Sequence, residues 1–137
     1  MARAIDVDPS DAVPIWRQIE DGVRRLVACG GLKPGEAVPS VRDLARDLRV
    51  NPATVAKAYQ RLTEAGLLEV RRGEGTFVSA TPPSVPHAER ARALRDGARR
   101  YAGVALGARF GRKDAAEALG EAFDHLDVRP REKGGRP

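Results

Sequence analysis

The side chains that most often carry out catalysis or bind metal ions are scarce in this 137-residue chain. Its one cysteine, Cys29, cannot form an internal disulfide or a CxxC site, and its two histidines, His87 and His125, lie outside any HExxH-type motif. Metal binding by a histidine with a nearby acid, such as Glu89 or Asp124, is an alternative. Because no nucleophile, base and orienting group gather in a motif, the sequence predicts neither an enzyme nor a cofactor or metal site.

Hydrogen-bond donors suited to an anionic polymer are more frequent. Thr54, Lys57 and Arg61 recur at three- and four-residue spacing, which places them on one side of a helix. Arg71 and Arg72 directly precede a glycine turn. Side chains of these types can bind phosphates and base edges, which makes nucleic acid a candidate partner, while an ordinary polar helix face is the alternative.

The overall charge is a weaker indication. The net charge is +5, but residues 1–80 hold 12 basic against 11 acidic side chains, while residues 81–137 hold 12 against 8. The basic excess therefore lies mainly outside the segment that carries the donors. We treat the bulk charge as weak evidence for a nucleic-acid partner.

The elements that must position these donors begin with an amphipathic helix. Pro14 suits a first helical turn, and Gly30 with Gly31 ends the pattern. Residues 1–12 show little periodicity and are predicted to be an N-terminal arm. The apolar side of the helix consists of Ile15, Ile19, Val23 and Leu26.

Two further helices follow at short intervals. Ser40 is placed to cap a helix over Val41–Leu48 by accepting a backbone N–H. Asn51 as N-cap and Pro52 at the first helical position predict another helix, which Gly66 stops. Two helices joined by so short a turn, behind a helix that covers their apolar sides, form a helix-turn-helix.

A β-hairpin is predicted directly after the third helix. LLEVRR and TFVSA have strand-like composition, and the glycines of GEG form the turn between them. The expected fold is therefore mainly α with a small β-hairpin: a winged helix-turn-helix domain over residues 13–80. TPPSVP, residues 81–86, breaks regular structure and is predicted to be a linker.

The rest of the chain is predicted to be helical over residues 87–127. Apolar residues recur at heptad-like spacing in two segments, and neither helix could fill a core alone. The last residues, 128–137, are basic and rich in glycine and proline, which is typical of a disordered tail.

Residues 13–80 resemble the DNA-binding domain of the GntR family of transcription regulators. PIWRQI, LKPGEAVPSVRDLA, VNPATVAKAYQRL and RRGEGTFV occur in the family's order. The helical tail of about fifty residues looks like the YtrA subfamily. Trp16 stands where a tyrosine is common, and Ala53 stands where the subfamily often has a larger polar residue.

The resemblance implies a DNA-binding surface. The third helix would enter the major groove, Arg42 would contact DNA beside it, and the wing would approach the phosphates or the minor groove. A solvated surface charge is the alternative for Arg42, and simple capping is the alternative for Asn51. The predicted DNA-binding residues are Ser40, Arg42, Arg46, Asn51, Pro52, Thr54, Lys57, Arg61, Arg72, Gly73 and Gly75.

The resemblance also implies partners. The chain is expected to repress transcription as a homodimer on operator DNA. Independently of the resemblance, apolar space between the dimer helices near Tyr101 and Phe110 is a hypothetical site for an unidentified small-molecule effector. The predicted dimerisation residues are Leu94, Tyr101, Leu106, Leu119 and Phe123.

A different class of function stays open. In an architectural or protein-interaction module the basic C-terminal helices would bind a partner and the winged domain would have lost base reading. No run of about 18 apolar residues and no signal peptide occur in the sequence, so we expect a cytoplasmic protein without a membrane partner, associated with the nucleoid when bound to DNA.

Overall fold

A computed structural model describes residues 5–126. These residues form two compact units that divide after Pro83, inside the segment predicted as a linker. Residues 1–4, Asp127 at the end of the predicted helical segment, and the predicted basic tail, 128–137, lie outside the described residues.

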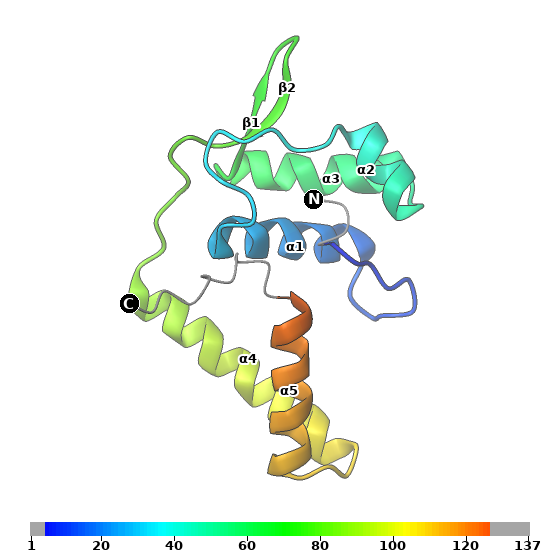
Figure 1. The fold of residues 1–137 in the computed structure, drawn as a ribbon, viewed down its shortest axis with the longest axis vertical. Helices are drawn as coiled ribbons and strands as arrows, with labels where there is room; N and C mark the ends of the chain where they lie inside the picture. Colours follow the sequence, from blue (N-terminus) through cyan, green and yellow to red (C-terminus); the bar gives the residue numbers. More distant parts are fainter. Residues whose placement is uncertain (1–4, 127–137) are drawn as a thin grey trace, which may run out of the picture. The chain divides into compact units, whose positions relative to one another are not determined.

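The first unit contains three helices, α1 (Ile15–Cys29), α2 (Val41–Leu48) and α3 (Pro52–Glu64). The two predicted caps are confirmed. Ser40 Oγ accepts a hydrogen bond of 3.0 Å from the N–H of Asp43, and Asn51 Oδ1 accepts one of 2.8 Å from the N–H of Ala53. Figure 1 shows α1 running along α3, with α2 at the N-terminal end of α3.

The β-hairpin that follows is the wing. It consists of β1 (Leu68–Arg71) and β2 (Gly75–Val78), paired antiparallel with Leu68 opposite Val78. The loop before α2 also pairs with β2, because Val38 N–H donates to the Thr76 carbonyl at 2.9 Å and Val78 N–H donates to the Glu36 carbonyl at 2.8 Å. This loop ties the base of the wing to the start of α2.

One hydrophobic core holds the first unit together. Each helix contributes apolar side chains from one side, and the base of the hairpin closes the core. Its largest fully buried side chains are Ile5, Ile19, Leu44, Leu62, Val23, Val55 and Val78.

Ile5 was not predicted to belong to this core. It lies in the arm before α1, yet only 1% of its surface is exposed. It packs where Gly22 has no side chain: a Cβ at Gly22 would lie 3.2 Å from Ile5 Cγ1. Ile5 is therefore part of the packed domain, and a 2.8 Å hydrogen bond from Asp8 N–H to the Gln18 side chain holds the same segment further.

We expect Ile5→Ala to lower the free energy of unfolding by about 2–4 kcal/mol, because it leaves a cavity against α1. Urea unfolding at neutral pH measures this change. Val13→Ala is the matched control: Val13 also precedes α1 but is 39% exposed, so its replacement should cost little. Equal unfolding midpoints for the Ile5 variant and the unaltered protein would contradict the packing role of the arm.

The second unit consists of α4 (His87–Gly107) and α5 (Arg112–Leu126). Tyr101 Oη donates a 2.6 Å hydrogen bond to the Ala115 carbonyl and links the two helices. Ala105 is the one residue of these helices that is buried, so most of their apolar surface faces solvent. No helix among the described residues is both long enough and apolar enough to cross a membrane.

Candidate nucleic-acid interface

Two exposed arginines of α2 differ in how they are held. Arg46 donates to the Asp43 carboxylate at 3.0 Å. Arg42 is exposed and forms no hydrogen bond or ion pair within residues 5–126. The Arg42 guanidinium is therefore free to bind an external acceptor with all of its donors.

The turn between α2 and α3 contains a further exposed arginine that sequence reasoning did not single out. Arg49 has φ 58°, in the left-handed region that residues other than glycine rarely adopt. This conformation ends α2 and lets α3 start only three residues later. Arg49 carries positive charge beside the N-terminus of α3, but no motif marked it in the sequence.

One side of α3 is buried in the core through Val55, Ala58, Tyr59 and Leu62. Tyr59 Oη donates a 2.8 Å hydrogen bond to the Pro39 carbonyl, which fixes α3 to the loop before α2. Burial raises the pKa of the Tyr59 phenol, so this donor keeps its proton. The hydrogen bond keeps α3 in place beside α2.

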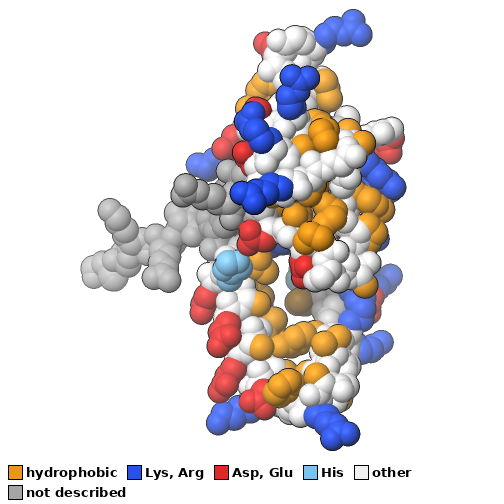
Figure 2. All heavy atoms as spheres, turned by 90° about the vertical axis from the view of Figure 1, so that its right-hand side faces the viewer, with side chains coloured by type: hydrophobic (Ala, Val, Ile, Leu, Met, Phe, Trp, Pro, Cys, Tyr) orange, Lys and Arg blue, Asp and Glu red, His pale blue; other side chains and the backbone are white. Residues whose placement is uncertain are grey.

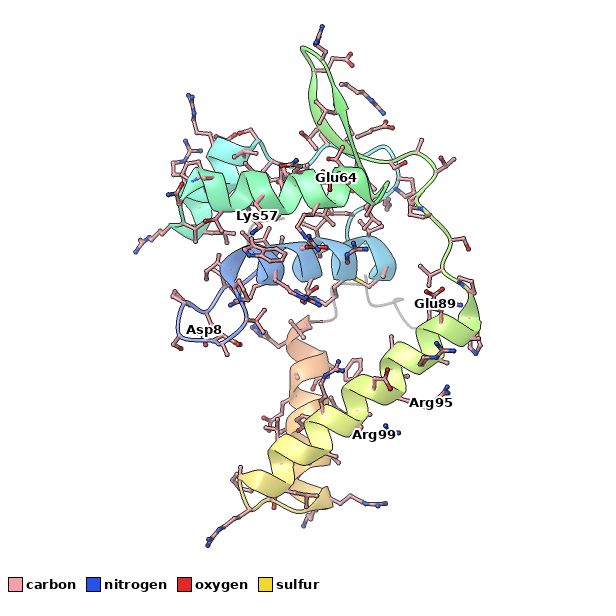
Figure 3. All side chains as sticks on the ribbon, turned by 180° about the vertical axis from the view of Figure 1, so that it is seen from behind. Asp8, Lys57, Glu64, Glu89, Arg95 and Arg99 are labelled. Atoms are coloured by element: carbon pink, nitrogen blue, oxygen red, sulfur yellow. The ribbon has the colours of Figure 1, made fainter. Side chains whose placement is uncertain are left out.

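A second side of α3 faces α1. Lys57 Nζ lies 4.5 Å from the centre of the Trp16 ring, and the Arg61 guanidinium lies 4.7 Å from the same centre. Arg61 Nε also donates to Glu20 at 2.9 Å. Figure 3 shows Lys57 pointing from α3 toward α1. Lys57 and Arg61 stay exposed, although Trp16 lies against both and Glu20 binds Arg61, so their DNA contacts stay a prediction.

Glu20 is the one buried charged residue among those described, with 7% of its surface exposed. It accepts hydrogen bonds from Arg61 at 2.9 Å and from Arg24 at 3.2 Å. Burial alone would raise the pKa of Glu20, but the hydrogen bonds and positive charges of these arginines outweigh it and lower the pKa below its ordinary value. Glu20 therefore remains a carboxylate and binds α1 to α3.

This lowered pKa predicts a pH-dependent stability. The contribution of Glu20 is fully present above the ordinary value of 4.5 and is lost as the pH falls through the lower folded value. Glu20→Gln should lose about 1–3 kcal/mol of unfolding free energy at pH 7 and show a smaller further loss below pH 4.5. Urea unfolding across pH measures both. Asp21→Asn, on the exposed side of α1, is the control. A stability profile of Glu20→Gln that runs parallel to that of the unaltered protein across pH would contradict the role of the Glu20 carboxylate.

The third side of α3 is exposed and carries small side chains. Ala53, Ala56 and Gln60 lie within a sector of about 60° by the helical rotation of about 100° per residue. Ala56 and Gln60, together with Val41 of α2 and residues of the wing, line a groove of about 330 Å³; Ala53 lies on the same side of α3 but outside this lining. We call this side the groove side of α3; sequence reasoning missed Ala56 and Gln60, which no charge or motif marked.

The other predicted residues of α3 lie at its N-terminal end. Pro52 occupies the first helical position and is exposed, while Thr54 is half-buried. The Asn51 carbonyl oxygen is used for capping, which leaves its amide group as a donor.

The two arginines of the wing differ in their contacts within the protein. Arg71 donates to Glu69 at 2.8 Å and lies 4.1 Å from the centre of the Phe77 ring. Arg72 is exposed and has no partner in the described part of the chain. Gly73 and Gly75 follow with φ 80° and 123°, so glycine is required for this turn. Figure 2 shows basic side chains at the tip of the wing.

Comparison with known proteins identifies this arrangement. Residues 16–78 match the family described as bacterial regulatory proteins, gntR family. The HTH-type transcriptional regulator Rv1152 of Mycobacterium tuberculosis is 36% identical over 113 residues, covering 82% of this chain and 88% of that protein. The chain belongs to the GntR family. It is a transcriptional regulator with a DNA-binding domain, and not an enzyme.

Two further GntR relatives support this assignment. The HTH-type transcriptional repressor YtrA of Bacillus subtilis is 44% identical over 75 residues, 55% of this chain and 58% of YtrA, so the match spans little more than half of that relative. The structure of YtrA from Sulfolobus acidocaldarius, a GntR-family transcription factor, is 36% identical, covers 69% of this chain and 96% of its own, and superposes with a TM-score of 0.56. The predicted fold class is thereby confirmed.

In this GntR protein the predicted dimerisation residues lie on the second unit. Leu94 is 72% exposed, Leu106 71% and Phe123 62%, and Leu119 is also exposed. Tyr101 is half-buried and lines, with Leu106 and Leu119, a mainly apolar groove of about 330 Å³ in the corner between α4 and α5. Figure 2 shows apolar side chains of these helices open to solvent.

The alternative of a metal site finds no support in the described residues. No group of three or more His, Cys, Asp or Glu side chains converges within residues 5–126.

Proposed function

We propose that this GntR-family chain is a homodimeric repressor that binds a dyad-symmetric operator. The observation that carries the proposal is the exposed groove side of α3, which lies between two free arginines. Arg42 belongs to α2, which lies at the N-terminal end of α3, and Arg72 belongs to the wing, which rises beside the C-terminal half of α3 (Figure 1). A helix that enters the major groove needs this open side and flanking cations.

The DNA contact that we propose for each predicted residue follows from the contacts of its side chain within the protein. Arg42, Asn51, Pro52 and Thr54 would meet base edges or nearby phosphates at the N-terminus of α3. Ser40 and Arg46 would add phosphate contacts from α2, and Arg72, Gly73 and Gly75 would do so from the wing. Lys57 would have to leave Trp16 to reach DNA, and Arg61 would have to leave Glu20, so we assign no DNA contact to Arg61.

The proposal of a homodimer rests on the second unit. Two helices with one buried residue between them leave Leu94, Leu106 and Phe123 in water, which is unfavourable for a stable single copy. A second copy would cover these residues through a symmetric helical interface. Two DNA-binding units joined in this way would bind two half-sites of a palindromic operator.

Repression is supported by the relatives, since YtrA of Bacillus subtilis is named a transcriptional repressor. We propose that a small-molecule effector binds the apolar groove between α4 and α5, whose lining includes Tyr101 and Phe110. A protein with this function works in the cytoplasm on the nucleoid. Thermal-shift screening with metabolites tests the effector: a stabilising compound should lose its effect in Tyr101→Ala.

DNA binding is tested with the purified chain, the DNA upstream of its own gene and a scrambled duplex, over a salt series. We expect tight binding to the upstream DNA and weak binding to the scrambled duplex, with the log–log salt slope increasing by about 0.9 for each neutralised phosphate. Equal, weak binding to both duplexes would favour the architectural function instead. Repression is then measured with a reporter gene under the bound promoter.

A further inference from the structure

We infer that Ala53 and Ala56 of α3 recognise thymine methyl groups in the operator. Side chains outside the groove side of α3 form the hydrogen bonds to the bases. The inference rests on the proposed function, because it assumes that α3 enters the major groove. It names the chemistry by which the operator is selected.

The side chains of the groove side exclude most other kinds of base reading. Ala53 and Ala56 are exposed and end in a methyl group. Gln60 is the polar member, and its amide donates to Glu64 at 3.2 Å. Both cations of α3 lie over Trp16 instead. The first two turns of this side therefore offer DNA apolar surface and no charge.

The backbone at Pro52 and Ala53 offers no free N–H group to a base edge. Pro52 has no N–H, and the N–H of Ala53 is satisfied by the Asn51 side chain at 2.8 Å. Because neither alanine extends beyond Cβ, α3 can approach the floor of the groove closely. The apolar feature of that floor is the C5-methyl group of thymine, which makes favourable contacts with alanine.

Hydrogen-bonded reading is left to side chains outside this sector. The free guanidinium of Arg42 matches the O6 and N7 acceptors of guanine. We therefore expect a half-site in which a guanine is flanked by thymines, with the thymines recognised by their methyl groups and not by their hydrogen-bonding pattern.

The experiment removes single methyl groups from DNA. Full-length protein first selects its operator from random duplexes, and each thymine of both half-sites is then replaced by deoxyuridine, which changes only the methyl group. We expect one or two positions per half-site at which this replacement weakens binding about fourfold, or about tenfold or more when both half-sites are changed. Insensitivity at every thymine would overturn the inference.

Protein variants test which alanine side chain contacts which thymine methyl group. Ala53→Gly and Ala56→Gly should each abolish the deoxyuridine effect at its own thymine. Ala65→Gly, at an exposed alanine beyond the end of α3, is the matched control and should leave all effects unchanged. Deoxyuridine effects that persist in both variants would also overturn the inference. Selection of no sequence at all is a different result, because it would refute the proposed function itself.

Discussion

Arg42→Ala is expected to weaken operator binding by at least about 30-fold. A bidentate arginine–guanine pair contributes about 1–3 kcal/mol of discrimination, and a symmetric operator holds two such pairs. No partner within residues 5–126 holds the Arg42 guanidinium, so the whole side chain is available to DNA. Fluorescence anisotropy with operator and scrambled duplexes measures the loss, which should be much larger for the operator.

Two further variants separate the contributions of charge and geometry. Arg42→Lys keeps the charge but cannot form the two parallel hydrogen bonds, so it should retain the salt slope and lose most of the preference for the operator. Arg46→Ala, in the same helix, should have a smaller effect because Asp43 already holds that guanidinium at 3.0 Å. Unchanged operator affinity in Arg42→Ala would remove Arg42 from the interface.

The second large effect is expected from replacing Leu119 and Phe123 by aspartate. Each buried apolar side chain contributes about 1.5–3 kcal/mol, and symmetry counts both residues twice. The dissociation constant of the dimer should therefore rise at least about 10⁴-fold, and operator binding should fall to that of a single half-site. Sedimentation equilibrium and DNA binding at the same protein concentrations measure the two effects.

The opposite side of α5 supplies the control for this experiment. Glu117 and Glu121 project about half a turn away from Leu119 and Phe123 by helical geometry, so Glu117→Gln and Glu121→Gln should leave the dimer intact. An aspartate variant that stays dimeric would place the interface elsewhere. An unaltered protein that is monomeric would contradict the homodimer itself.

Local features of the first unit were predictable because they depend on neighbouring residues. Ser40 and Asn51 cap helices through backbone groups two or three residues away, and Pro52 fits the first turn without any distant partner. The glycine turn of the wing is equally local, since Gly73 and Gly75 adopt conformations that glycine tolerates. These signals placed α2, α3 and the wing in the correct order.

Side-chain partners across elements were not predictable in the same way. Helical spacing placed Lys57 and Arg61 on one side of α3, but it could not tell that Trp16 and Glu20 of α1 occupy that side. Ile5 lies in a segment without periodicity, so nothing in the pattern predicted that it fills the space over Gly22.

The elements and their caps were therefore predictable from sequence, because hydrogen bonds and periodicity over a few residues specify them. Which side of α3 is open and which arginines are free became clear from the packing of the helices against one another. A side chain becomes available to DNA only if no other element holds it, and that depends on packing between residues far apart in the chain. Arg61 and Glu20, 41 residues apart and joined by a hydrogen bond of 2.9 Å, are an example of such packing.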